Sequence, residues 1–287
     1  MSARGRLLSG LATIVIALAG FVGLGALPAA ASPPTIQYVA LGDSYAAGTA
    51  VGSFPNCPHN PDGYPALLDS ENRIDLQPNG NATCSGATAS EVADTQLSAL
   101  DPDTRLVTLT VGAADLELSR VLTTCTTGTL EACLGEIARA RGELEELASN
   151  LPVLYAQVAD AAPTARIVVT GYPHLFEPTA AFVDPRIITA VNQATDELNA
   201  IIEASVAAAN DADINIHYVD VTEEFAGHGI VAPITDPDAF IHSLFTCDPR
   251  LPDCADLEAF HPTDAGYEAY ADAIAAALPG GWLKQSV

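Results

Sequence analysis

The feature that most constrains the fold is an apolar run, Tyr38–Leu41, which ends abruptly in Gly42-Asp43-Ser44. Such a run is typical of a buried strand. Open α/β sheets place their chemistry just beyond the carboxyl ends of their strands. The run therefore predicts that a small hydroxyl side chain, that of Ser44, lies at the functional edge of a sheet.

Four further runs have strand character and alternate with helical patterns. The strand candidates are Leu106–Val111, Arg166–Gly171, Ile214–Val219 and a weaker one around Ile74-Asp75-Leu76. Apolar residues recur at helical spacing over residues 137–160, over residues 185–209 and after Pro262-Thr263. Strands that alternate with helices indicate an α/β domain whose parallel sheet is covered on both faces.

The amino-terminal residues have the pattern of an export signal. A positively charged start and a largely apolar stretch, residues 7–27, precede a small-residue pattern that ends at Ala31. We expect a signal peptide over residues 1–31, a single domain over residues 32–287 and a secreted, extracellular protein. The alternative is an uncleaved membrane anchor, because the apolar stretch is just long enough to span a bilayer.

Six cysteines follow the predicted signal peptide, and an even number in an exported chain suggests three disulfides. Fifteen pairings are formally possible. The spacing favours sequential pairs: Cys57 with Cys84, Cys125 with Cys133, and Cys247 with Cys254.

Charge and residue spacing limit the partners. The chain has 36 acidic and 11 basic residues, and its formal net charge is −25. This argues against nucleic acid and anionic membrane surfaces, which need a basic patch. No motif has metal-ligand spacing, so we expect neither a metal nor another cofactor. We expect a monomer with no nucleic-acid partner and no stable membrane association after signal cleavage.

A second informative segment, Glu258-Ala259-Phe260-His261, lies near the other end of the chain. A serine hydroxyl is a weak nucleophile, and an imidazole such as that of His261 can accept its proton. If the segment makes a helical turn, Glu258 lies close to His261 and fixes the tautomer of its ring. Asp256 and Asp253 are the alternatives. The set predicts an acyl hydrolase with Ser44, His261 and Glu258 as catalytic residues and a small-molecule or lipid ester as its substrate.

In these motifs the chain resembles the SGNH, or GDSL, hydrolases, and most of all their secreted actinobacterial lipase and esterase branch. The resemblance is carried by Gly42-Asp43-Ser44, Cys84-Ser85-Gly86-Ala87-Thr88, Val169-Thr170-Gly171-Tyr172-Pro173, Phe225-Ala226-Gly227-His228-Gly229 and residues 258–263. It implies a flavodoxin-like, three-layer α/β/α fold with a five-stranded parallel sheet. It also implies that the backbone N–H groups of Ser44 and Gly86 form an oxyanion hole. The family acts on acylglycerols, phospholipids, short-chain esters and acetylated sugars.

The chain departs from the family at one position. The resemblance leads us to expect Gly-Gly-Asn-Asp after the strand at residues 106–111, but the sequence is Gly112-Ala113-Ala114-Asp115. Ala114 has no side-chain donor, and loss of one oxyanion donor costs on the order of 10²–10³ in rate. Three explanations remain: a slower esterase, a substitute donor such as Asn79 or Asn81, or a catalytically impaired extracellular binding protein on the same fold.

Overall fold

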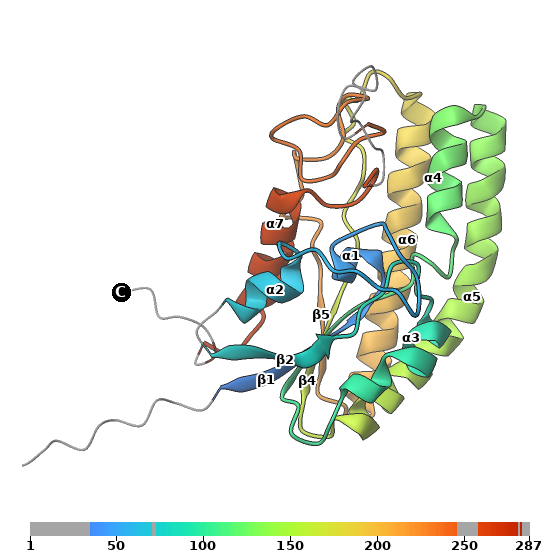
Figure 1. Cartoon of the computed structure of the whole chain (residues 1–287). Coiled ribbons are helices and arrows are strands. Elements are labelled where there is room, and N and C mark those ends of the chain that lie inside the picture. The colour runs from blue at the N-terminus through green and yellow to red at the C-terminus, as the bar shows by residue number, and fades with distance from the viewer. Residues whose placement is uncertain (1–34, 71–72, 246–257, 281, 283–287) are drawn as a thin grey trace, which may run out of the picture. The chain divides into compact units, whose positions relative to one another are not determined.

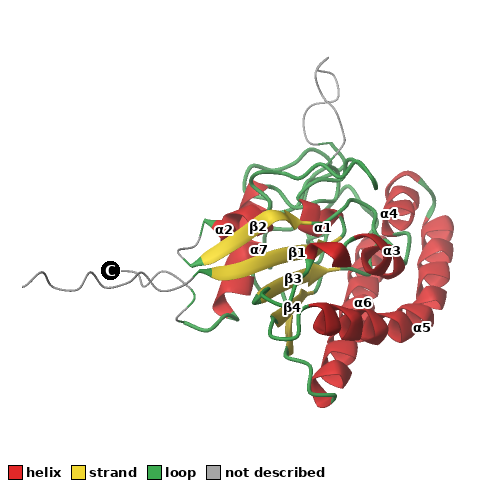
Figure 2. Cartoon of the chain, turned by 60° about the horizontal axis from the view of Figure 1, so that its bottom comes forward, coloured by secondary structure: helices red, strands yellow, loops and turns green. Residues whose placement is uncertain are grey.

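A five-stranded, entirely parallel sheet forms the centre of the protein (Figures 1 and 2). The structure is a computed structural model that describes residues 35–70, 73–245, 258–280 and 282. From one edge to the other the strands are β2 (Ile74–Asn81), β1 (Ile36–Gly42), β3 (Leu106–Thr110), β4 (Arg166–Thr170) and β5 (Ile216–Val219). This is the flavodoxin-like order, so the predicted fold class is confirmed.

Helices cover both faces of the sheet, and the unit therefore has three layers (Figure 2). One face carries α2 (Tyr64–Asp69) and α7 (Asp264–Ala276). The other carries α3 (Ala89–Thr95), α5 (Leu130–Ala161) and α6 (Pro185–Asp211), and α4 (Leu118–Thr127) packs on α5. The short α1 (Ser44–Ala47) follows β1 directly. None of the described helices is long and apolar enough to cross a membrane.

The central strands are buried along nearly their whole length, whereas β2 is an edge strand. All five residues of β3 are buried, as are the last five of β1. In β2 buried and exposed residues mix, and the strand contains Pro78, which an edge strand tolerates because one side has no hydrogen-bonding partner. The register between β1 and β2 shifts between Tyr38 and Ala40. These irregularities explain why β2 was the weakest strand candidate in the sequence.

Two disulfides connect described residues, Cys57–Cys84 and Cys125–Cys133, and these are the first two of the expected sequential pairs. Cys125 is in α4 and Cys133 is in α5, so the second bridge joins these helices near their connection. The expected pair Cys247–Cys254 lies outside the described residues, as does the predicted signal peptide.

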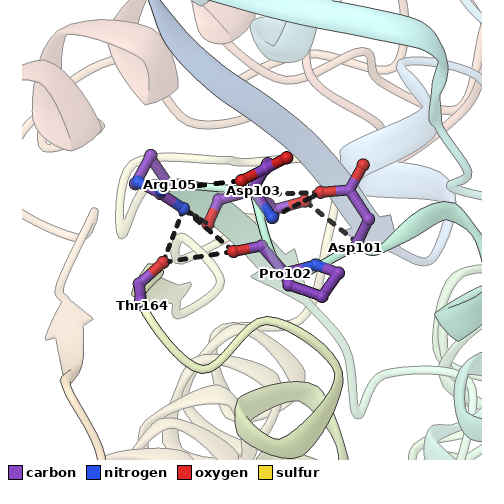
Figure 3. A network of polar contacts seen from close by, with 6 residues as sticks. Asp101, Pro102, Asp103, Arg105 and Thr164 are labelled. Atoms are coloured by element: carbon purple, nitrogen blue, oxygen red, sulfur yellow. Dashed lines mark hydrogen bonds and ion pairs between the residues drawn. The ribbon is translucent and has the colours of Figure 1, made fainter.

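Arg105, which immediately precedes β3, joins the segments at the amino-terminal ends of the strands (Figure 3). Its guanidinium donates to the hydroxyl of Thr164 at 2.5 Å and to the carbonyl of Pro102 at 3.0 Å. Its backbone N–H donates to Gln37 O at 2.9 Å. The ion pair with exposed Asp103 is long, at 3.9 Å, and such surface pairs stabilise little. These contacts hold the amino-terminal ends of neighbouring strands together, whereas Ser44 lies at the opposite, carboxyl-terminal end of β1.

Candidate active site

Ser44 stands at the carboxyl end of β1 because the chain turns sharply there. Gly42 has φ 132°, and a Cβ at this position would collide with the carbonyl oxygen of Thr110. Asp43 then caps α1, since its carboxylate accepts a hydrogen bond from the N–H of Tyr45 at 3.0 Å. Ser44 is the first residue of α1, and its hydroxyl therefore lies at the carboxyl edge of the sheet.

His261 reaches Ser44 from a segment 217 positions further along the chain. Its Nε2 atom lies 2.8 Å from the hydroxyl oxygen of Ser44, and its Nδ1 atom lies 3.0 Å from the carbonyl oxygen of Ala259. A carbonyl only accepts hydrogen bonds, so Nδ1 carries the proton and Nε2 is free to accept the serine proton. Tyr45 packs against the imidazole ring and donates to the carbonyl of Phe260 at 2.6 Å, which anchors this segment.

The carboxylate of Glu258 is not at Nδ1 of His261, contrary to the expectation from the sequence. It accepts instead from the hydroxyl of Thr49 at 2.9 Å and from the N–H of Ala50 at 3.0 Å. The expectation assumed a helical turn, but Phe260 adopts φ 66°, which no helical turn contains. The alternatives Asp253 and Asp256 lie outside the described residues.

Burial sets the basicity of the histidine. The side chain of His261 is buried, and this lowers its pKa below 6.5 because burial disfavours the charged imidazolium. The hydrogen bond to Ala259 and the charge of Glu258 oppose that shift. His261 is therefore neutral near pH 7, which is the form that can accept a proton.

A cavity of about 470 Å³ opens over the pair. Ser85 and Gly86 line one side of it, and Ala113 and Ala114 line another. Residues of the turn before α4 and of α4 itself complete the wall: Glu117, Leu118, Ser119, Arg120, Leu122 and Thr123. This wall has an apolar part that suits an acyl or alkyl group.

Ser44 and Gly86, the residues expected to donate backbone N–H groups to an oxyanion, both line the cavity. Gly86 has φ 76°, a left-handed conformation that favours glycine, and it lines the cavity together with Ser44. Ala114 also lines the cavity and offers only a methyl group. Neither Asn79 nor Asn81 is among the described lining residues, so the structure does not bring these candidate donors to the site.

A buried hydrogen-bond chain, which the sequence did not reveal, joins the serine segment to the Ala114 segment. The hydroxyl of Tyr172 donates to the carboxylate of Asp43 at 2.5 Å and accepts from the N–H of Ala113 at 3.1 Å. Burial raises the pKa of Asp43 to about 7, and the hydrogen bond from Tyr172 opposes the rise. The available signal was the position of Tyr172 directly after β4, at the same edge of the sheet as Ser44.

No described residues form a metal site, since no group of three or more His, Cys, Asp or Glu side chains among them could hold an ion. The chemistry that the contacts place in the cavity is that of a serine hydroxyl beside a neutral imidazole. A hydroxyl and an imidazole at the carboxyl edge of a parallel sheet are the groups that a serine hydrolase would use.

Comparison with known proteins identifies the family. The profile of the "GDSL-like Lipase/Acylhydrolase family" matches residues 40–269, and the chain belongs to that family. It is 36% identical over 211 residues to a lipase from Streptomyces rimosus, covering 70% of this chain and 76% of that protein. It is 31% identical over 275 residues to Lipase 1 from Streptomyces coelicolor, covering 92% of this chain and 94% of that protein.

Solved structures give the same answer. The crystal structure of phospholipase A1 from Streptomyces albidoflavus matches with a TM-score of 0.70 and 31% identity, covering 84% of this chain and 99% of that one. That of the extracellular lipase from Streptomyces rimosus matches with a TM-score of 0.71 and 30% identity, covering 85% and 100%. The resemblance to the actinobacterial branch is confirmed, and the chain is a carboxylic ester hydrolase.

Proposed function

We propose that this ester hydrolase is secreted and works through an acyl-enzyme on Ser44. The observation that carries the proposal is the 2.8 Å contact between the hydroxyl of Ser44 and Nε2 of His261, inside a cavity that can hold an ester. The extracellular lipase from Streptomyces rimosus and the export pattern of residues 1–31 support secretion. Amino-terminal sequencing of the secreted protein should give Ser32 as its first residue.

The mechanism follows from the atoms that meet in the cavity. The oxygen of Ser44 attacks the ester carbonyl carbon while Nε2 of His261 takes its proton. The N–H groups of Ser44 and Gly86 stabilise the negative oxygen of the tetrahedral intermediate. The bond to the alkoxy oxygen then breaks, and the imidazolium protonates the departing alcohol. Water then attacks the acyl carbon while Nε2 of His261 takes its proton, the bond to the Ser44 oxygen breaks, and the imidazolium returns the proton to Ser44 as the acid leaves.

In this mechanism the third member beside serine and histidine is a backbone carbonyl. The oxygen of Ala259 accepts the Nδ1 proton and holds the ring of His261 in the productive tautomer. Glu258 contributes its charge from a greater distance and fastens the neighbouring loop through Thr49 and Ala50. The loss of an oxyanion donor at Ala114 should make this enzyme slower than relatives with an asparagine there.

A fluorophosphonate probe tests the proposal, because it reacts only with an activated serine. The folded protein should be labelled at Ser44, as shown by peptide mass spectrometry, and the Ser44→Ala and His261→Ala variants should not be. The lost donor at Ala114 favours one other function, a catalytically impaired binding protein on this fold. Folded protein that resists labelling and hydrolyses no ester would establish that alternative.

A further inference from the structure

A tight turn beside the cavity presents two apolar residues to solvent. The N–H of Ser53 donates to the carbonyl of Asn56 at 3.1 Å, and the N–H of Asn56 donates to the carbonyl of Ser53 at 2.8 Å. Phe54 and Pro55 therefore form the tip. The side chain of Phe54 is 64% exposed, more than any other large apolar side chain among the described residues, and nearby Val51 is 38% exposed. We call residues 51–56 the apolar turn.

The apolar turn is fastened at both ends to the segment that carries Ser85 and Gly86, two residues that line the catalytic cavity. On one side the carbonyl of Ala50, a residue that lines the cavity, accepts from the hydroxyl of Ser85 at 2.9 Å. On the other, Cys57 is bonded to Cys84, with 4.9 Å between the Cα atoms. Three residues span at most about 10 Å, so the tip stays close to the segment that carries Gly86.

The charge of the chain selects the surface that this turn can meet. Residues 48–61 contain no Asp, Glu, Lys or Arg, in a chain with 16% charged residues and a net charge of −25. An exposed aromatic side chain on an uncharged loop is compatible with the boundary between lipid and water. The acidic remainder of the protein is repelled by anionic lipid, so a zwitterionic or uncharged lipid surface is the compatible partner.

We propose that the apolar turn inserts into the surface of aggregated zwitterionic or uncharged lipid and places the mouth of the cavity at that surface. Phe54 supplies most of the apolar area, and the hydrogen bonds of the turn hold it exposed before binding, so little ordering is needed on contact. One aromatic side chain gives reversible adsorption and not stable anchoring. The catalytic consequence rests on the proposed function, whereas the adsorption itself does not.

Vesicle binding tests the proposal without interference from hydrolysis. The Ser44→Ala protein is mixed with phosphatidylcholine vesicles, and the bound fraction is measured by flotation. Adding Phe54→Ser should weaken partitioning about tenfold or more, because transfer of a whole phenyl side chain is lost. Val153→Ser is the matched control, since Val153 is 58% exposed but lies in α5, and it should leave partitioning unchanged. Phosphatidylglycerol vesicles should bind more weakly than phosphatidylcholine at low salt.

Activity gives the second measurement. For this measurement Ser44 is left intact. Phe54→Ser should then slow hydrolysis of vesicular lipid esters and leave hydrolysis of a soluble short-chain aryl ester unchanged. Partitioning unaffected by Phe54→Ser, or no adsorption of the parent protein, would overturn the proposal. Light scattering provides a further check. A dimer that Phe54→Ser dissociates, with vesicle binding unchanged, would also overturn the proposal, because the turn would then contact a second copy of the chain. If adsorption depends on Phe54 but fluorophosphonate does not label the protein that retains Ser44, the proposed function is overturned and the adsorption proposal stands.

Discussion

The Nδ1 atom of His261 lies 3.0 Å from the backbone carbonyl oxygen of Ala259, and no carboxylate takes that position among the described residues. A carbonyl carries a partial charge, so it orients the ring but stabilises the imidazolium less than a carboxylate would. Glu258, the acid that the sequence suggested for this role, is bound to Thr49 and Ala50. Orientation and charge support are thus divided between two neighbouring residues.

The first prediction separates these two roles. Ser44→Ala and His261→Ala should each lower kcat by at least about a thousandfold, because the two groups act as a unit. Glu258→Gln should change kcat only a few-fold, since it removes charge but leaves the hydrogen bond between His261 and Ala259. Steady-state kinetics on a soluble ester, with circular dichroism to verify folding, provide the measurement. A loss in Glu258→Gln as large as that in His261→Ala would show that the carboxylate is the true partner.

The second prediction concerns Ala114. An asparagine there should supply a donor whose hydrogen bond strengthens as the carbonyl oxygen gains charge, so Ala114→Asn should raise kcat by roughly tenfold or more and leave KM nearly unchanged. Asn79→Ala and Asn81→Ala should have no effect on turnover, because neither side chain lines the cavity. An unchanged kcat in Ala114→Asn would mean that this position does not limit the oxyanion hole.

The fold could be predicted from the sequence where burial is uniform. β3 and β4 appeared as continuous apolar runs because helices cover both faces of the sheet, whereas β2 was weak because it is an edge strand with a proline. Helix α4 was not predicted. Its sequence contains four threonines, whose branched side chains lower helix propensity, and its packing on α5 provides the stability that local preference lacks.

The site could be predicted only as far as its motifs extend. Ser44 and His261 stand in segments with a recognisable pattern, and the structure brings them together. The direction of Glu258 depends on one backbone angle, the positive φ of Phe260, which no pattern indicates. The contact between Tyr172 and Asp43 joins residues 129 positions apart, so it depends on the order of the strands and not on local sequence.

The third prediction concerns the two disulfides in the described part of the chain. Cys57–Cys84 spans 27 residues and Cys125–Cys133 spans 8. Loop-closure entropy then gives a stabilisation of about 3.5 kcal/mol for the first and about 2.5 kcal/mol for the second. The double serine variant of each pair should lower the free energy of unfolding in that order, measured by denaturant titration without reductant.

Only the variant at Cys57 and Cys84 should also lower kcat, because Cys84 is two residues from Gly86. Equal losses of kcat in both variants would contradict this.

The fourth prediction concerns the buried contact between Tyr172 and Asp43. Burial raises the pKa of Asp43 to about 7, and the Tyr172 hydroxyl holds it down by donating to the ionised form. Removing the hydroxyl in Tyr172→Phe should therefore raise this pKa further and free the N–H of Ala113, which loosens the segment that carries Ala114.

The consequence for activity has a definite sign. We expect the ionised carboxylate of Asp43 to be the form that holds Tyr172, so kcat/KM of the wild type should fall as the pH drops through about 7. In Tyr172→Phe the same fall should occur at higher pH and from a lower maximum. In Asp43→Asn it should move below 6.5, where protonation of His261 alone limits the rate.

Stability should follow the same titration. The folded-state pKa of Asp43 lies above its ordinary value of 3.8, so the folded protein binds a proton that the unfolded chain has released between about pH 4 and pH 7. This contribution to the free energy of unfolding is fully present below pH 4 and is lost as the pH rises through about 7.

Tyr155→Phe is the matched control, because Tyr155 is a buried tyrosine whose hydroxyl has no hydrogen-bond partner among the described residues. If the fall of kcat/KM at low pH stays at the same pH in Tyr172→Phe, or moves equally in Tyr155→Phe, then the ionisation of Asp43 does not control the segment that carries Ala114.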